Sequence, residues 1–182
     1  MPLSPPAPRS LSHTRRIECN GYRRADGLWD IEGHLTDVKT RPIQNAWRGE
    51  LPPGEPIHEM WVRLTVDDAL LVRDIEVSSD KTPFRICPDI APGFAVLKGL
   101  QIGPGWNRAV KERVGGVKGC THIVELMGPL ATVAYQTIYW AAERKESQRD
   151  PNSRPHQLDT CHALASDSEV VREHFPQFYR GR

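Results

Sequence analysis

HEMWVRLTVDDALLVRDIEV, residues 58–77, alternates apolar and polar side chains on either side of two consecutive aspartates. His58, Met60, Val62, Leu64 and Val66 share one face of an extended chain. The Asp67-Asp68 pair is typical of a tight turn, and a second apolar run follows from Leu70 to Val77. The stretch therefore predicts two antiparallel strands joined by a short turn.

A third strand is predicted upstream, within residues 15–39. Its apolar positions recur at every second residue, opposite a polar set, and Asp26-Gly27 before it is typical of a turn. We assign Asp37, near its end, to a turn as well. Residues 40–57 hold four prolines and two glycines, so we expect an irregular loop there. The inward set is Trp29, Ile31, Gly33 and Leu35, and the outward set is Asp30, Glu32 and His34.

Helical periodicity replaces the alternation after Pro83. We expect helices at 94–100, 106–114 and 121–144, separated by glycine-containing turns. The last helix carries an apolar stripe at spacings of three and four residues, which predicts a face that packs on a core. The fold class is therefore α+β, a small antiparallel three-stranded sheet packed against helices. The stripe is formed by Ile123, Leu126, Leu130, Ala134 and Ile138.

The 182 residues suffice for one domain with a hydrophobic core. We expect a disordered proline-rich arm over residues 1–14 and a single α+β domain over 15–182. Within that domain, residues 15–80 are strand-rich, 84–145 are helical, and 146–182 form a docked tail.

Charge and composition exclude several classes of protein. The chain has 24 Lys and Arg against 23 Asp and Glu, a net charge of +1, which provides no basic field for nucleic acid. The first residues contain no apolar run typical of a signal peptide, and no later run is long enough to cross a membrane. Four widely spaced cysteines do not form the dense pattern of a disulfide-stabilised secreted domain. We expect a cytoplasmic protein with reduced thiols, whose partner is a small molecule or another protein, and the sequence leaves its oligomeric state open.

Gly119-Cys120-Thr121-His122 is the stretch most typical of a chemical site. It lies where a glycine-rich turn enters the long helix, so the thiol faces the unpaired N–H groups and the positive end of the helix dipole. Such a position lowers the pKa of a cysteine and favours the thiolate, which binds soft metals or attacks electrophiles. In the plainer alternative Cys120 is a small buried residue and Thr121 caps the helix.

Two further residues extend this pair to the four ligands of a closed metal site. Cys87 is placed between the last strand and the first helix, and His58 begins a strand after a proline-rich loop. Cys87, Cys120, His58 and His122 together suit zinc or iron. The alternative is a small metal- or cysteine-dependent enzyme, a hydrolase or lyase, in which Cys120 is the nucleophile, His122 the base and Glu125 a base or a partner of the imidazole.

Other groups are weaker candidates. Asp30, Glu32 and His34 could serve acid–base chemistry or a hard metal, although a solvated polar face is the plainer interpretation. Cys161 could add a ligand if the tail folds back over the sheet. A third hypothesis is an interaction module that recruits a partner through residues 158–179.

The order of these elements over residues 58–142 resembles the scaffold proteins of iron–sulfur cluster assembly. In those scaffolds a polar residue at a strand start, a cysteine after the next strand, and a cysteine with a histidine at a helix start bind zinc or a cluster. The resemblance implies that His58 stands where the family has an aspartate, Cys87 at the middle cysteine, and Cys120 with His122 at the last pair. It implies a similar fold, and an iron–sulfur cluster as an alternative to a single ion.

The whole chain also resembles a bacterial family known only as domain of unknown function 2889. The resemblance is carried by the segments DGLWDIEGHLTD, PIHEM, GCTH and LDTCHAL, at residues 26–37, 56–60, 119–122 and 158–164. It implies no activity.

Overall fold

The computed structural model describes residues 3–143, 153–155 and 157–181, with the side chains of 140–143 left out. Two compact units result, residues 1–141 and 142–182. The expectation of a single domain with a docked tail stays a prediction, and residues 146–152 and 156 of that tail lie outside the described part. Residues 3–12 have no helix or strand, and strand β1 begins at His13, two residues before the expected start of the domain at residue 15.

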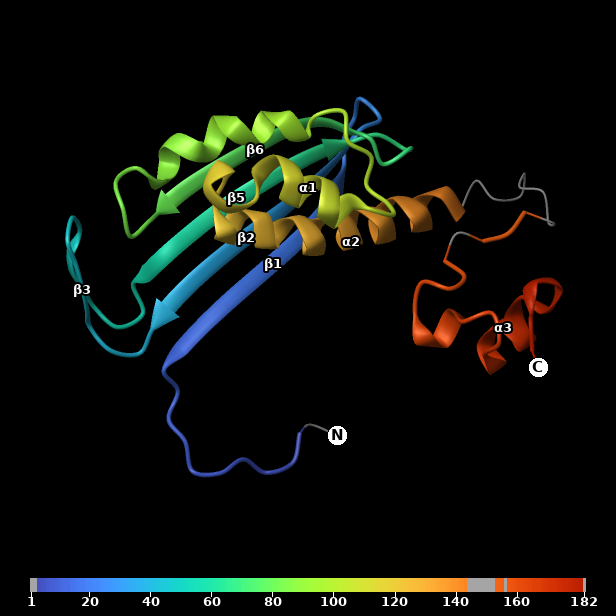
Figure 1. Cartoon of the computed structure of the whole chain (residues 1–182), viewed down its shortest axis with the longest axis horizontal. Helices are drawn as coiled ribbons and strands as arrows, with labels where there is room; N and C mark the ends of the chain where they lie inside the picture. Colours follow the sequence, from blue (N-terminus) through green and yellow to red (C-terminus); the bar gives the residue numbers. More distant parts are fainter. Residues whose placement is uncertain (1–2, 144–152, 156, 182) are drawn as a thin grey trace. The chain divides into compact units, whose positions relative to one another are not determined.

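The first unit is built on an antiparallel sheet of four strands, in the order β1-β2-β5-β6 (Figure 1). Helices cover one face of this sheet, and the opposite face is left open by the described helices of the unit (Figure 1). The α+β class is therefore confirmed, while the predicted sheet was one strand short. The strands are β1 (His13–Arg23), β2 (Trp29–Lys39), β5 (Pro56–Val66) and β6 (Val72–Lys81).

The missing strand, β1, is an edge strand with mostly exposed side chains. An edge strand buries little on either face, so no apolar alternation marks it in the sequence. It joins β2 through the predicted Asp26-Gly27 turn, where Gly27 has a φ of 88° and the Asp26 carboxylate accepts the N–H of Leu28.

Residues 40–57 contain a second correction. They form a two-stranded hairpin, β3 (Ile43–Asn45) and β4 (Gly49–Leu51), and the first residues of β5. The prolines flank the hairpin strands, so they remove no hydrogen bond from the ladder. The Asn45 carboxamide accepts the N–H groups of Trp47 and Arg48, and Gly49, with a φ of 77°, completes the turn.

The Asp67-Asp68 turn between β5 and β6 is confirmed. The Asp67 carboxylate accepts the N–H groups of Ala69 and Leu71, and Leu70 takes a positive φ. The Asp68 carboxylate accepts the indole N–H of Trp29 at 2.9 Å, which fastens this turn to β2.

Three helical segments cover the sheet. The 3₁₀ helix η1 (Cys87–Leu97) replaces the predicted helix at 94–100. Pro88 favours a helix start before residue 94, and Pro92 inside the segment disfavours a regular α-helix. The helices α1 (Trp106–Val114) and α2 (Thr121–Glu143) lie close to their predicted bounds. The predicted stripe of α2 is fully inside the core, and Leu130 packs where Gly33 of β2 leaves room.

The second unit contains the short elements η4 (His162–Leu164), α3 (Glu169–His174) and η5 (Pro176–Phe178). Leu158 and Val171 are its buried apolar residues among those described. The Ser168 hydroxyl caps α3 by accepting the N–H of Val171.

We predict that Leu130→Ala lowers the free energy of unfolding by about 2–5 kcal/mol, because it empties the contact between α2 and β2. Urea denaturation followed by circular dichroism measures this. Val117→Ala is the control, since Val117 is fully exposed and its loss is expected to change stability by less than about 0.5 kcal/mol. Equal stability of the two variants would contradict this packing.

Candidate functional site

The candidate site is organised around Asp37, the last inward residue of β2. Asp37 is only 2% exposed, although charged residues are rarely buried. Asp37 lies on the same face as Ile31 and Leu35, so it points toward the helices with the apolar core. Its assignment to a turn was therefore wrong.

Strand register brings partners to Asp37 from both sides. Arg15 of β1 and His58 of β5 lie directly opposite it in the two antiparallel ladders. Residues opposite one another in such a ladder point to the same face, so the three side chains form a row across three strands. A β-bulge between Asp37 and Val38 follows this row, and bulges of this kind often lie next to functional sites.

Arg15 holds both oxygens of the Asp37 carboxylate. Its Nε lies 2.8 Å from Oδ1 and its second terminal nitrogen 2.7 Å from Oδ2, a bidentate pair. The other terminal nitrogen donates to Glu125 of α2, so Arg15 also connects the sheet to the helix. His13 adds a nitrogen 3.2 Å from Asp37 Oδ1.

Two histidines complete the group. His58 Nδ1 lies 3.1 Å and His122 Nε2 3.6 Å from Asp37 Oδ2, and the two imidazole rings stack with their centroids 3.7 Å apart. His122 reaches this position because α2 begins at Thr121, which places the second residue of its first turn over the end of the sheet. Ligand atoms of Asp37, His58 and His122 all lie within 4.8 Å of one another, so the group could hold a metal ion.

Cys120 lies on the other side of the His122 ring. Its Sγ is 3.7 Å from His122 Nδ1, while Nε2 of the same ring faces Asp37. Burial raises the pKa of the Cys120 thiol, but the bond with His122 and the N–H groups at the start of α2 outweigh burial, and the net pKa lies below its usual value. The position of the thiol at the helix start is the one that the sequence predicts.

The electrostatics of the group favour an ionised carboxylate and a neutral imidazole. Burial raises the pKa of Asp37, yet the hydrogen bonds and charge of Arg15, with the nearby imidazoles, bring it below its usual value. Burial and the neighbouring His122 lower the pKa of His58 to about 4, although Asp37 acts in the opposite direction. At neutral pH the group therefore offers an anionic oxygen and a neutral ring nitrogen, the forms that bind metals.

Cys87, Cys161 and Glu125 are further candidates from the sequence. Cys87 begins η1 and does not belong to the group of three, so its role as a ligand stays a prediction. Cys161 is exposed in the second unit. Glu125 accepts a hydrogen bond from Arg15 rather than from His122. All four cysteines are free, and among the described residues they form no cluster that could hold iron and sulfur.

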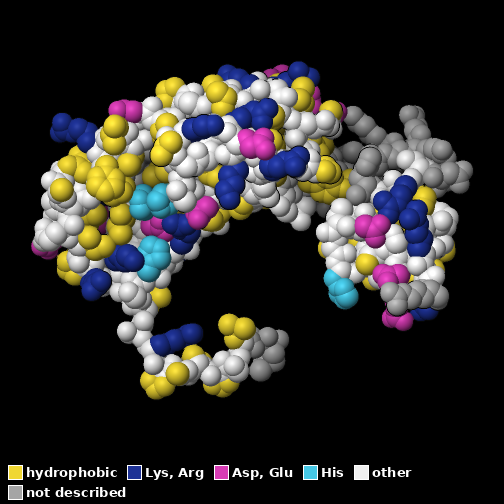
Figure 2. Space-filling model, viewed as in Figure 1, with side chains coloured by type: hydrophobic (Ala, Val, Ile, Leu, Met, Phe, Trp, Pro, Cys, Tyr) yellow, Lys and Arg dark blue, Asp and Glu magenta, His cyan; other side chains and the backbone are white. Residues whose placement is uncertain are grey.

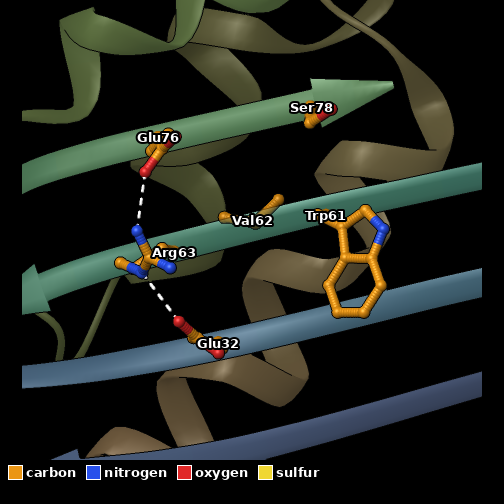
Figure 3. Close-up of a pocket in the computed structure, with 6 residues that line it drawn as sticks. All are labelled: Glu32, Trp61, Val62, Arg63, Glu76 and Ser78. Atoms are coloured by element: carbon orange, nitrogen blue, oxygen red, sulfur yellow. Dashed lines mark hydrogen bonds and ion pairs between the residues drawn. The ribbon is translucent and has the colours of Figure 1, made fainter. Parts of the chain in front are cut away.

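Asp30, Glu32 and His34 occupy the open face of the sheet, away from Asp37. Each is already paired: Asp30 with Thr65 and Arg24, Glu32 with Arg63, and His34 with Glu59. Figure 3 shows Arg63 between Glu32 and Glu76, with which it forms ion pairs. These residues and Trp61 line a surface pocket of about 240 Å³. The Trp61 ring stacks on that of His34 with the centroids 3.6 Å apart. This is a polar, ion-paired surface of the kind that the plainer interpretation expects.

Fold and site define an α+β protein with a buried Asp/His group that could hold a metal ion. The chain belongs to the family described as Protein of unknown function (DUF2889), whose model matches residues 13–136. This confirms the predicted family over β1 to α2, while the segment LDTCHAL lies outside the matched range. No curated protein and no solved structure matches the chain. The likeness to iron–sulfur scaffolds therefore has no support, either from relatives or from a gathering of cysteines in the described structure.

Three segments that carry the family resemblance converge on the site. The segment ending in Leu35-Thr36-Asp37 supplies the carboxylate, PIHEM supplies His58, and GCTH supplies Cys120 and His122. Among the described side chains of the first unit, no other group of three such ligands lies within 4.8 Å. The site and the family resemblance thus rest on the same residues. Among the described residues, no helix is both long and apolar enough to span a bilayer.

We predict that the metal-free protein loses stability as the pH falls from about 6.5 to about 4. In this window the unfolded chain takes up a proton at His58, whose unfolded pKa is about 6.5, whereas the folded protein does not. The free energy of unfolding therefore decreases with decreasing pH, and His58→Gln is expected to flatten this dependence. Urea denaturation of both proteins at several pH values measures the slope, and an unchanged slope in the variant would contradict the burial of a neutral His58.

Proposed function

We propose that the protein binds one zinc or iron(II) ion through Asp37, His58 and His122, and that the ion acts on a small molecule. The observation that carries this proposal is the approach of the three ligand atoms to within 4.8 Å of one another. Two histidines and one carboxylate form the ligand set of catalytic zinc sites and of non-haem iron(II) sites.

The distances around Asp37 suit an ion. Two atoms that each lie about 2.0–2.1 Å from a metal, at tetrahedral or octahedral angles, are about 2.9–3.4 Å apart. The two imidazole nitrogens lie 3.1 and 3.6 Å from Asp37 Oδ2, so small side-chain movements bring them into that range. Arg15 uses one acceptor position on each oxygen, and a carboxylate has about four such positions, so it leaves room for the ion and orients the ligand.

Three ligands leave coordination positions open, and this favours an enzyme over a closed structural site. The sequence predicts that Cys120 is a metal ligand, and this proposal gives it another role. Because His122 turns Nε2 toward Asp37, its Nδ1–H donates to the Cys120 sulfur, which fixes the orientation of the imidazole. In this proposal Cys120 orients a ligand and does not bind the ion itself. Asp37 takes the place of the two cysteines in the ligand set that the sequence predicts, and both histidines remain.

We predict that the purified protein takes up about one zinc or cobalt(II) ion per chain. Asp37→Asn, His58→Ala and His122→Ala are expected to weaken binding at least about a hundredfold, since even partners of ligands contribute about 10–100-fold. Elemental analysis and isothermal titration calorimetry measure this, with circular dichroism to show that each variant folds.

His34→Ala and Cys87→Ala are the matched controls. His34 is an imidazole on the open face of the sheet, and Cys87 is the cysteine that sequence order places in the site. Both variants are expected to keep the ion. Loss of metal in Cys87→Ala would restore the sequence hypothesis, and a wild-type protein that binds no ion would end the proposal.

A second candidate function is favoured by one observation, the chain of contacts from Cys120 Sγ through His122 to Asp37. A cysteine, a histidine and a carboxylate in this order are the parts of a nucleophilic catalyst, in which the carboxylate orients the base. The sulfur–nitrogen distance of 3.7 Å is that of a long hydrogen bond to sulfur, and such catalytic contacts often shorten when substrate binds.

We predict for this candidate that, in chelator-treated protein near pH 7, iodoacetamide modifies Cys120 faster than the exposed Cys161. The lowered pKa of Cys120 is the physical reason, and His122→Ala is expected to remove the difference. Mass spectrometry of the two cysteine peptides over time measures both rates. Slower modification of Cys120 than of Cys161 would exclude a nucleophilic role.

A further inference from the structure

The proposed metal ligands lie at one end of the sheet, where several other segments meet. Strands β2 and β6 end there, and β1 and β5 begin there, as their antiparallel registers require. The β3–β4 hairpin follows β2, and residues 82–86 follow β6, so both connections emerge at the end that contains Asp37 and His58.

Hydrogen bonds hold these connections together. The Asn45 carboxamide of the hairpin donates to the carbonyl of Pro83 at 2.9 Å. Arg48 donates to the carbonyl of Pro56 at 2.9 Å and to the carboxylate of Glu55 at 2.8 Å, immediately before His58. The hairpin is therefore fixed against both the start of β5 and the segment after β6.

These connections expose three large apolar side chains, Trp47, Phe84 and Ile86, which we call the apolar rim. They are 46%, 64% and 72% exposed. Figure 2 shows hydrophobic side chains gathered beside histidines at this end of the sheet. Exposed apolar side chains next to a few polar groups often mark a ligand-binding site.

From these features we infer that the molecule bound at the metal site has an apolar, aromatic or aliphatic body and a singly charged oxygen head group. This inference rests on the proposed metal site. The head group would take the open positions of the ion, and the body would cover the apolar rim.

Charge selects the head group. Arg15 is paired with two carboxylates, Asp37 and Glu125, so a divalent ion and these three side chains together leave one positive charge. A histidine that binds a metal does so as the neutral imidazole, so the two histidine ligands add no charge. A monoanionic oxygen donor balances the site, as a carboxylate, an enolate or a hydroxamate would.

The apolar rim could instead bind a second copy of the chain, because exposed apolar surfaces also form protein–protein interfaces. We favour the small molecule because the hairpin that carries Trp47 is hydrogen-bonded to the residues just before His58, and the open positions of a metal take a donor atom. The oligomeric state is measured within the same test.

The test compares two hydroxamates on the cobalt(II)-loaded protein, acetohydroxamate and benzohydroxamate. Both bind a metal through the same two oxygens and differ in the apolar body. The cobalt absorption bands report their binding. Benzohydroxamate is expected to bind at least about tenfold more tightly, because burying a phenyl ring against the rim removes apolar surface from water.

The decisive variant is the triple change Trp47→Ser, Phe84→Ser and Ile86→Ser, with Tyr22→Ser as the control. Tyr22 is 48% exposed and pairs with Asp30 near the opposite end of β2. The triple variant is expected to bind acetohydroxamate as the wild type does and to lose the preference for benzohydroxamate, whereas Tyr22→Ser keeps it.

Four outcomes would overturn the inference. Equal affinities in the wild type, or a preference that survives the triple change, would overturn it and leave the metal site standing. A wild-type dimer that the triple change converts to a monomer, with no change in hydroxamate affinity, would make the rim an interface between copies. A protein that takes up no cobalt would remove the proposed metal function and this inference together.

Discussion

The buried carboxylate of Asp37 is the constraint on which this end of the molecule depends. Removing an ionised group from water costs several kcal/mol unless charged and hydrogen-bonding partners offset the loss. Arg15 provides the opposite charge from β1, His58 contributes from β5, and His122 from α2. The edge strand, the central strands and the long helix must therefore all be in place before Asp37 is satisfied, so assembly of the fold and assembly of the site are the same event.

Much of the fold is local enough to be predicted. The apolar stripe of α2 and the alternation of β5 depend on side chains close together in the chain, and both are confirmed. The strand β1 escaped prediction because an edge strand has no buried face to impose a pattern. The hairpin at 43–51 escaped because prolines flank it, and their number hid the short strands between them.

The candidate site was predicted in part. Cys120, His122 and His58 were recognised as chemical residues, and the structure brings His58 and His122 together. Asp37 was missed because it is a charged residue at a position where alternation predicts an apolar one. Continuing the inward series two residues beyond Leu35 places it inside, and that signal was available. Arg15 could not be found, because its role depends on a register between strands that no local pattern determines.

Side chains of β2 alternate between the two faces of the sheet, so the position of Asp37 depends on the exact number of residues that precede it in the strand. Inserting or deleting one residue between Leu35 and Asp37 would turn the carboxylate to the open face of the sheet and bring Thr36 or its neighbour inward. After Val38 the constraint is weaker, since the bulge already absorbs one residue and the hairpin connection can vary in length. Related chains that differ in length are therefore expected to differ in residues 39–55 and to keep the exact spacing from Trp29 to Asp37.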